Sequence, residues 1–78
     1  MINQHDSNND RIGYWEIYYN GNVLYKGNYI NSKQNGYWEV YYMNGNIKHK
    51  GNYTNNKEIG YWEVYHPNGK LNYKEFHI

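Results

Sequence analysis

The chain repeats one short motif three times. Gly-Tyr-Trp-Glu begins at positions 13, 36 and 60, so it recurs after 23 and then after 24 residues. A fixed period in the twenties indicates an array of small structural repeats. The copies span 13–35, 36–59 and 60–78, and together they form one repeat domain that covers nearly all of the 78 residues.

Each copy has the pattern of a β-hairpin. Its first half, Tyr-Trp-Glu followed by Ile or Val and Tyr, is rich in the aromatic and β-branched residues that favour strands. An Asn-Gly pair follows in every copy, and Asn-Gly between two such runs is a strong hairpin signal. No apolar period of about 3.6 residues points to a helix. The fold class expected is therefore all-β.

The turns differ in length by one residue. Asn20 and Gly21 form a two-residue loop, which suits a type I′ turn. The second and third loops have three residues each, which places Gly45 and Gly69 in the left-handed conformation. The extra residue of the longer period is thus absorbed in the turn.

Counting outward from the turns predicts which residues face each other. In the first hairpin the predicted pairs are Glu16 with Tyr25, Trp15 with Lys26 and Tyr14 with Gly27, and the other hairpins repeat them. A lysine opposite a tryptophan would form a cation–π contact of about 0.5–1 kcal/mol. A tyrosine opposite a glycine would cover bare backbone.

The linkers between hairpins are short, so we expect neighbouring hairpins to lie side by side. The product is a twisted, single-layer antiparallel meander of about six strands. Residues 1–12 are polar and are expected to be a flexible N-terminal arm, although 7–13 aligns with 54–60 and suggests a remnant half-repeat. Strand parity assigns Trp15, Ile17 and their copies to one face, and Tyr14, Tyr18, Val23, Tyr25 and their copies to the other. Both faces then carry apolar rings, which a self-association surface would cover.

Composition excludes several classes of function. The net charge is +1 and the pI is about 7.9, so a basic nucleic-acid footprint is not expected. There is no cysteine for disulfides or thiolate metal sites. No apolar run is long enough for a membrane helix, and no apolar signal segment opens the chain. These features predict a cytoplasmic location.

The polar residues do not form a catalytic pattern. Both serines and both aspartates fall in the arm or in a linker, and the repeated Glu16, Glu39 and Glu63 are expected to be solvated cross-strand partners. The histidines His49, His66 and His77 replace tyrosines of other copies. Glu39 with His49 is the least unsuitable metal pair. We therefore expect a non-enzymatic chain with no cofactor and no metal site.

The segment from Tyr25 to Tyr42, YKGNYINSKQNGYWEVYY, resembles the MORN repeat, and the resemblance extends over residues 13–78. It is closest to the variant found in the YwqK-type proteins, which are known as antitoxin components. The family's pattern falls on Tyr25, Gly27, Tyr29, Asn31, Lys33, Gly36, Trp38 and Tyr41. The chain departs from it at Ser32, where the family has glycine, and at Glu75, where the glycine is lost and the copy stops.

The resemblance implies an elongated single-layer sheet and contacts with other proteins, often as a homodimer. We therefore expect a protein–protein interaction or assembly module that pairs with itself or with another protein. Neutralisation of a partner toxin is the alternative function, and binding of a glycan or a membrane lipid by the aromatic and lysine-bearing face is a further one. The candidate interaction residues are Trp15, Trp38, Trp62, Tyr18, Tyr41, Tyr65, Phe76 and Ile78. Phe76 and Ile78 lie on the last expected strand, whose open edge invites pairing.

Overall fold

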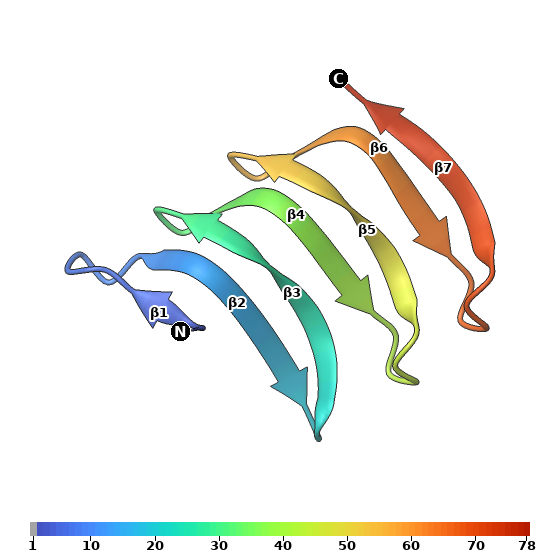
Figure 1. The fold of residues 1–78 in the computed structure, drawn as a ribbon, viewed down its shortest axis with the longest axis horizontal. Helices are drawn as coiled ribbons and strands as arrows, with labels where there is room; N and C mark the ends of the chain where they lie inside the picture. Colours follow the sequence, from blue (N-terminus) through green and yellow to red (C-terminus); the bar gives the residue numbers. More distant parts are fainter. Residues whose placement is uncertain (1) are drawn as a thin grey trace.

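The protein is one open antiparallel sheet of a single layer (Figure 1). The computed structural model describes residues 2–78, and Met1, part of the expected arm, lies outside the described residues. The strands are β1 (Gln4–His5), β2 (Arg11–Tyr19), β3 (Asn22–Ile30), β4 (Lys33–Tyr41), β5 (Ile47–Thr54), β6 (Lys57–Tyr65) and β7 (Leu71–His77). Each strand pairs with its neighbour in sequence, and the sheet measures 41 × 35 × 14 Å. The expected all-β meander is confirmed, with seven strands in place of about six.

The additional strand comes from the residues expected to be an arm. Gln4 pairs with Ile12 and His5 with Arg11, across a turn closed by a 2.9 Å hydrogen bond from the Asp6 N–H to the Asp10 carbonyl. His5 packs edge-on against Trp15 with ring centroids 5.1 Å apart, much as Tyr53 packs against Trp62 at 5.0 Å. The segment therefore acts as a partial repeat and covers part of the outer edge of β2.

The turns have the predicted conformations. Asn20 and Gly21 have φ values of 49° and 79°, which is the type I′ geometry. Gly45 and Gly69 are left-handed with φ of 93° and 89°. Ser32 is also left-handed, and its hydroxyl accepts a 2.9 Å hydrogen bond from the N–H of Arg11.

The predicted register within the hairpins is wrong by one residue beyond the turn. Trp15 lies opposite Gly27, and Glu16 lies opposite Lys26. The cause is a β-bulge, which leaves one residue of the second strand without a partner in every hairpin. The unpaired residues are Leu24, Lys48 and Asn72.

The bulge also corrects the assignment of faces. A shift of one residue moves a side chain to the opposite face, so Tyr25 lies on the same face as Trp15 and not on the other one. We call this side the Trp face; it carries Trp15, Ile17, Tyr25, Tyr29, Trp38, Val40, His49, Tyr53, Trp62, Val64, Tyr73, Glu75 and His77. The opposite side, which we call the Tyr–Glu–Lys face, carries Tyr14, Glu16, Tyr18, Lys26 and their copies.

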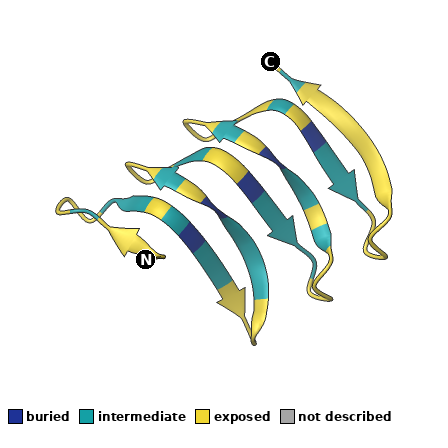
Figure 2. Cartoon of the chain, viewed as in Figure 1, coloured by how far each residue is buried: buried dark blue, intermediate teal, exposed yellow. Residues whose placement is uncertain are grey.

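The three tryptophans are the core of the sheet. Trp15, Trp38 and Trp62 are only 6%, 1% and 2% exposed. Buried residues, dark blue in Figure 2, lie midway along β2, β4 and β6. Trp38 lies flat over Gly27, and Trp62 lies flat over Gly51. The indole N–H of Trp38 donates to the Asn28 carbonyl at 3.0 Å, as that of Trp62 does to Asn52 at 3.1 Å. A one-layer sheet thus buries its largest side chains against its own backbone.

Tyrosine rings fill the spaces between the tryptophans. Tyr29 stands edge-on to Trp15 and Trp38, with centroid distances of 5.9 Å and 5.1 Å. Tyr53 bridges Trp38 and Trp62 in the same way, at 5.9 Å and 5.0 Å. Such edge-to-face pairs each add about 0.5–1.5 kcal/mol beyond their burial. The ladder links each repeat to the next.

Substitution of Gly51 by alanine tests this packing. An added Cβ would lie 2.3 Å from the Trp62 ring, so the ring must move, and overpacking of this kind costs about 1–3 kcal/mol. We expect Gly51→Ala to lower the free energy of unfolding by that amount in urea denaturation. Asn52→Ala, an adjacent and exposed position, is the control and should change it by less than about 0.5 kcal/mol. Equal stability of the two variants would show that the glycine is not required by the ring.

Candidate interaction surface

A row of alternating acidic and basic side chains crosses the Tyr–Glu–Lys face. Glu16 pairs with Lys26, Lys26 with Glu39, Glu39 with Lys50, and so on to Lys74. The predicted contacts of these lysines with tryptophans are therefore not formed, because the two residue types point to opposite faces. Lys26 and Lys50 instead lie 5.7 Å and 5.6 Å from the ring centroids of Tyr41 and Tyr65.

Tyrosines on either side of the row bind the glutamates. Glu39 accepts hydrogen bonds from the phenols of Tyr37 at 2.9 Å and Tyr41 at 2.5 Å. Glu16 accepts in the same way from Tyr14 and Tyr18, at 2.9 Å and 2.8 Å. Most polar groups of this face therefore bind one another.

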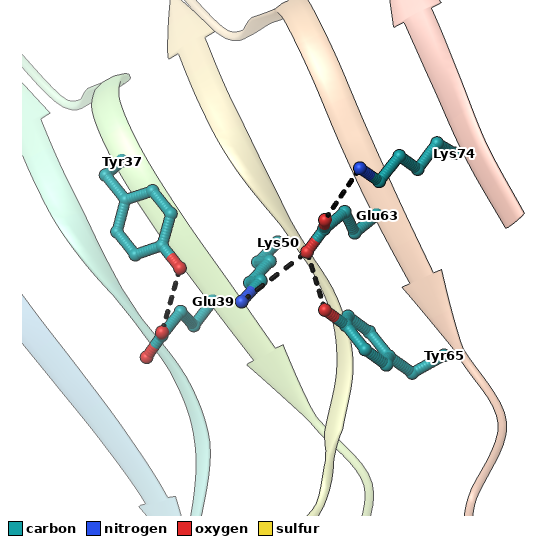
Figure 3. A network of polar contacts seen from close by, with 6 residues as sticks. All are labelled: Tyr37, Glu39, Lys50, Glu63, Tyr65 and Lys74. Atoms are coloured by element: carbon teal, nitrogen blue, oxygen red, sulfur yellow. Dashed lines mark hydrogen bonds and ion pairs between the residues drawn. The ribbon is translucent and has the colours of Figure 1, made fainter. Parts of the chain in front are cut away.

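The third repeat departs from this arrangement (Figure 3). Glu63 accepts a 2.6 Å hydrogen bond from Tyr65 and lies 3.5 Å and 3.6 Å from the ammonium groups of Lys50 and Lys74. Tyr61, the copy of Tyr14 and Tyr37, makes no hydrogen bond to it in the part of the chain that the structure describes. The Tyr61 ring packs instead against Phe76, with centroids 4.9 Å apart, and is 70% exposed.

These side chains form an exposed apolar group on β6 and β7. We call Ile59, Tyr61, Phe76 and Ile78 the C-terminal patch; the first three lie on the Tyr–Glu–Lys face, and Ile78 directly follows β7. Phe76 is 59% exposed, and β7 is exposed along almost its whole length in Figure 2. No described residue lies beyond the outer edge of β7. Exposed apolar side chains beside an open strand edge are a typical protein interaction site.

The candidate interaction residues divide into three groups. Trp15, Trp38 and Trp62 lie in the core and present almost no surface. Tyr41 and Tyr65 are half-buried and donate their hydroxyls to glutamates. Tyr18, Phe76 and Ile78 are exposed, and only the last two are close together, Phe76 on β7 and Ile78 directly after it. Ile59 and Tyr61 are not among the residues predicted from the sequence. Once the bulge is included in the register, Tyr61 pairs with Phe76 and joins the candidates.

The structure separates the pair considered for a metal. Glu39 lies opposite Lys50 on the Tyr–Glu–Lys face, whereas His49 lies opposite Val40 on the Trp face. Burial lowers the pKa of His49. Among residues 2–78 no three His, Asp or Glu side chains converge in a way that could hold a metal ion.

The Trp face contains a hollow beside the central tryptophan. It is lined by Tyr25, Tyr29, Gln34, Trp38 and Val40. The Tyr25 ring stacks on Trp38 with centroids 5.4 Å apart. Stacking of a sugar on Trp38 therefore requires displacement of Tyr25.

Comparisons with known proteins leave the family of the chain open. No protein-family model, no curated protein and no solved structure matches it. Within the described residues, no helix has the length and apolar character needed to cross a membrane.

The tyrosine hydrogen bonds predict how stability depends on pH. Hydrogen bonding from Tyr65 and the nearby Lys50 and Lys74 lower the pKa of Glu63. The unfolded chain therefore binds more protons in acid, and this stabilisation is present above the unfolded pKa and lost as pH falls. We expect the Tm to fall from about pH 5 to pH 3, and Glu63→Gln to make that fall shallower.

Tyr65→Phe is the companion variant, because it removes the phenol and keeps the ring. It should flatten the same pH profile by a similar amount. If both variants keep the slope of the unaltered protein in thermal denaturation, the Glu63 network does not contribute to acid sensitivity.

Proposed function

We propose that the chain is a non-enzymatic protein–protein interaction module that self-associates through the C-terminal end of its sheet. The observation that carries the proposal is the C-terminal patch beside the open edge of β7. Burial of exposed apolar surface is the main favourable term in most protein association. Tyr73 and Leu71, 47% and 49% exposed, add apolar surface on the same strand.

The opposite end of the sheet exposes less strand edge for pairing than β7 does. The outer edge of β2 is covered from Arg11 to Glu16 by β1 and by Asn3, whose side-chain amide donates to the Glu16 carbonyl at 2.9 Å. Arg11 stacks on Trp15, with its guanidinium carbon 4.3 Å from the ring centroid. The two ends therefore differ, and the exposed strand edge belongs to β7.

Neutralisation of a partner toxin is the alternative function, and the resemblance to the YwqK-type proteins favours it. It would use the same patch and edge but a different protein as the partner. A 1:1 complex with a second protein, formed by a chain that is monomeric alone, would support this alternative.

Glycan or membrane-lipid binding is supported less well. The tryptophans are buried, which removes the rings on which a sugar would stack. The lysines lie in a row with glutamates, so the face has no excess of positive charge to attract anionic lipid.

Phe76→Lys tests self-association. The new charge would be buried in the contact, and loss of such an anchor costs about 2 kcal/mol or more, which is about 30-fold in Kd. We expect the mass measured by sedimentation or light scattering to shift from dimer toward monomer at micromolar concentration. Tyr19→Lys, an exposed aromatic residue at the first turn, is the control and should leave the mass unchanged.

The mass of the unaltered chain over a range of concentrations is the second test of self-association. A monomer at every concentration would contradict self-association, and the exposed edge would then be assigned to a different protein.

A further inference from the structure

Glu75 restricts the kind of strand that can pair with β7. It occupies the position of Gly27 and Gly51, the glycines over which the following tryptophans lie. At Gly27 even a bare Cβ would come within 2.0 Å of the Trp38 ring. A strand with the Tyr-Trp-Glu pattern therefore cannot lay its tryptophan over Glu75, and neither a further repeat of this kind nor β2 of a second copy fits.

The strand that fits is β7 of a second copy. It carries no tryptophan and has an open edge (Figure 1). Two identical edges pair antiparallel about a two-fold axis, which closes the assembly as a dimer. Head-to-tail growth is blocked at the other end, because β1 and Asn3 already hydrogen-bond the edge of β2.

We propose that the chain dimerises by antiparallel pairing of β7 with β7 of a second copy, with Phe76 opposite Phe76 of that copy. This inference rests on the proposed self-association and specifies its geometry. The two-fold axis runs normal to the sheet, so each face continues into the same face of the second copy. Paired residues must then come from the same face.

Charge selects the register among the few that obey this rule. Pairing Lys74 with its own copy, or Glu75 with its own copy, places like charges directly opposite, which destabilises a sheet. Pairing Tyr73 with its own copy sets Asn72, the bulge residue, against Lys74 and leaves Phe76 and Ile78 unpaired. The Phe76 register avoids all of these contacts.

The Phe76 register also brings complementary groups together. Glu75 lies opposite His77 of the second copy, and within one chain its carboxylate is already 2.9 Å from the His77 ring nitrogen. Lys74 lies opposite Ile78, whose side chain can cover the aliphatic part of the lysine. The Tyr61 ring packs against Phe76 at 4.9 Å, so four aromatic rings would form one row across the axis.

Cysteine cross-linking tests the register, since the natural chain has no cysteine. Directly opposed residues of an antiparallel pair have Cα atoms about 4.5–5.5 Å apart, within disulfide range. We expect Phe76→Cys to form a disulfide-linked dimer under mild oxidation. Lys74→Cys, on the same strand and face, is the matched control; it lies about 13 Å from its own copy in this register and should not cross-link.

Mixing two charge variants tests the pairing without changing Phe76. His77→Glu alone places glutamates opposite each other, and Glu75→Lys alone places a lysine opposite a histidine. Each should raise the dimer Kd about tenfold or more. In a 1:1 mixture the introduced glutamate faces the introduced lysine, so a heterodimer should form with a Kd close to that of the unaltered protein.

The outcomes distinguish an error in the register from an error in β7 pairing and from an error in self-association. Cross-linking of Lys74→Cys as fast as Phe76→Cys would overturn the register. If the unaltered chain is dimeric, but neither cysteine cross-links and the mixed variants do not recover, self-association stands and β7 pairing is wrong. A monomeric unaltered chain would overturn self-association itself.

Discussion

The contact of a tryptophan ring with a glycine of the preceding strand supports the rest of this structure. A single-layer sheet has no second layer to cover its side chains, so each large ring must be buried within the layer. Gly27 and Gly51 leave space for the ring to lie on the backbone, and the neighbouring tyrosines close it in from the sides. The indole N–H is satisfied by a carbonyl of that same strand. Nearly complete burial of Trp38 and Trp62 is thereby achieved without a hydrophobic layer above them.

This contact also explains where the repeat pattern is interrupted. Glycine is needed only beneath a following tryptophan, so the last strand accepts Glu75 at the same position. On the opposite face, tyrosine phenols donate to the glutamates of the central row, and Glu63 also pairs with Lys50 and with Lys74, which ends the row and is 57% exposed. Both faces therefore lose partners at β7, where the apolar side chains of the C-terminal patch remain exposed.

The two ends of the sheet differ in whether the backbone groups of the edge strand are hydrogen-bonded. At the first end, two residues of β1 and the side chain of Asn3 make the hydrogen bonds to β2 that a full neighbouring strand would otherwise make. At the last end, the backbone groups of the β7 edge have no such partner among the described residues. A sheet whose edge is protected at one end only favours a closed dimer over a growing filament. This asymmetry supports the proposed self-association through β7.

The period of the glycines and tryptophans was enough to predict three hairpins, their order and the turn types at Asn20, Gly45 and Gly69, because these depend on local backbone preferences. The position of Phe76 on the last strand followed from the same count. The register did not, because the bulges at Leu24, Lys48 and Asn72 shift it by one residue, and they form only through pairing between strands. The same non-local contacts bury the tryptophans named as candidate binding residues, draw residues 4–5 and 11–12 into the sheet and leave Tyr61 exposed. Only the tertiary structure decides such outcomes, since each depends on which strand lies alongside.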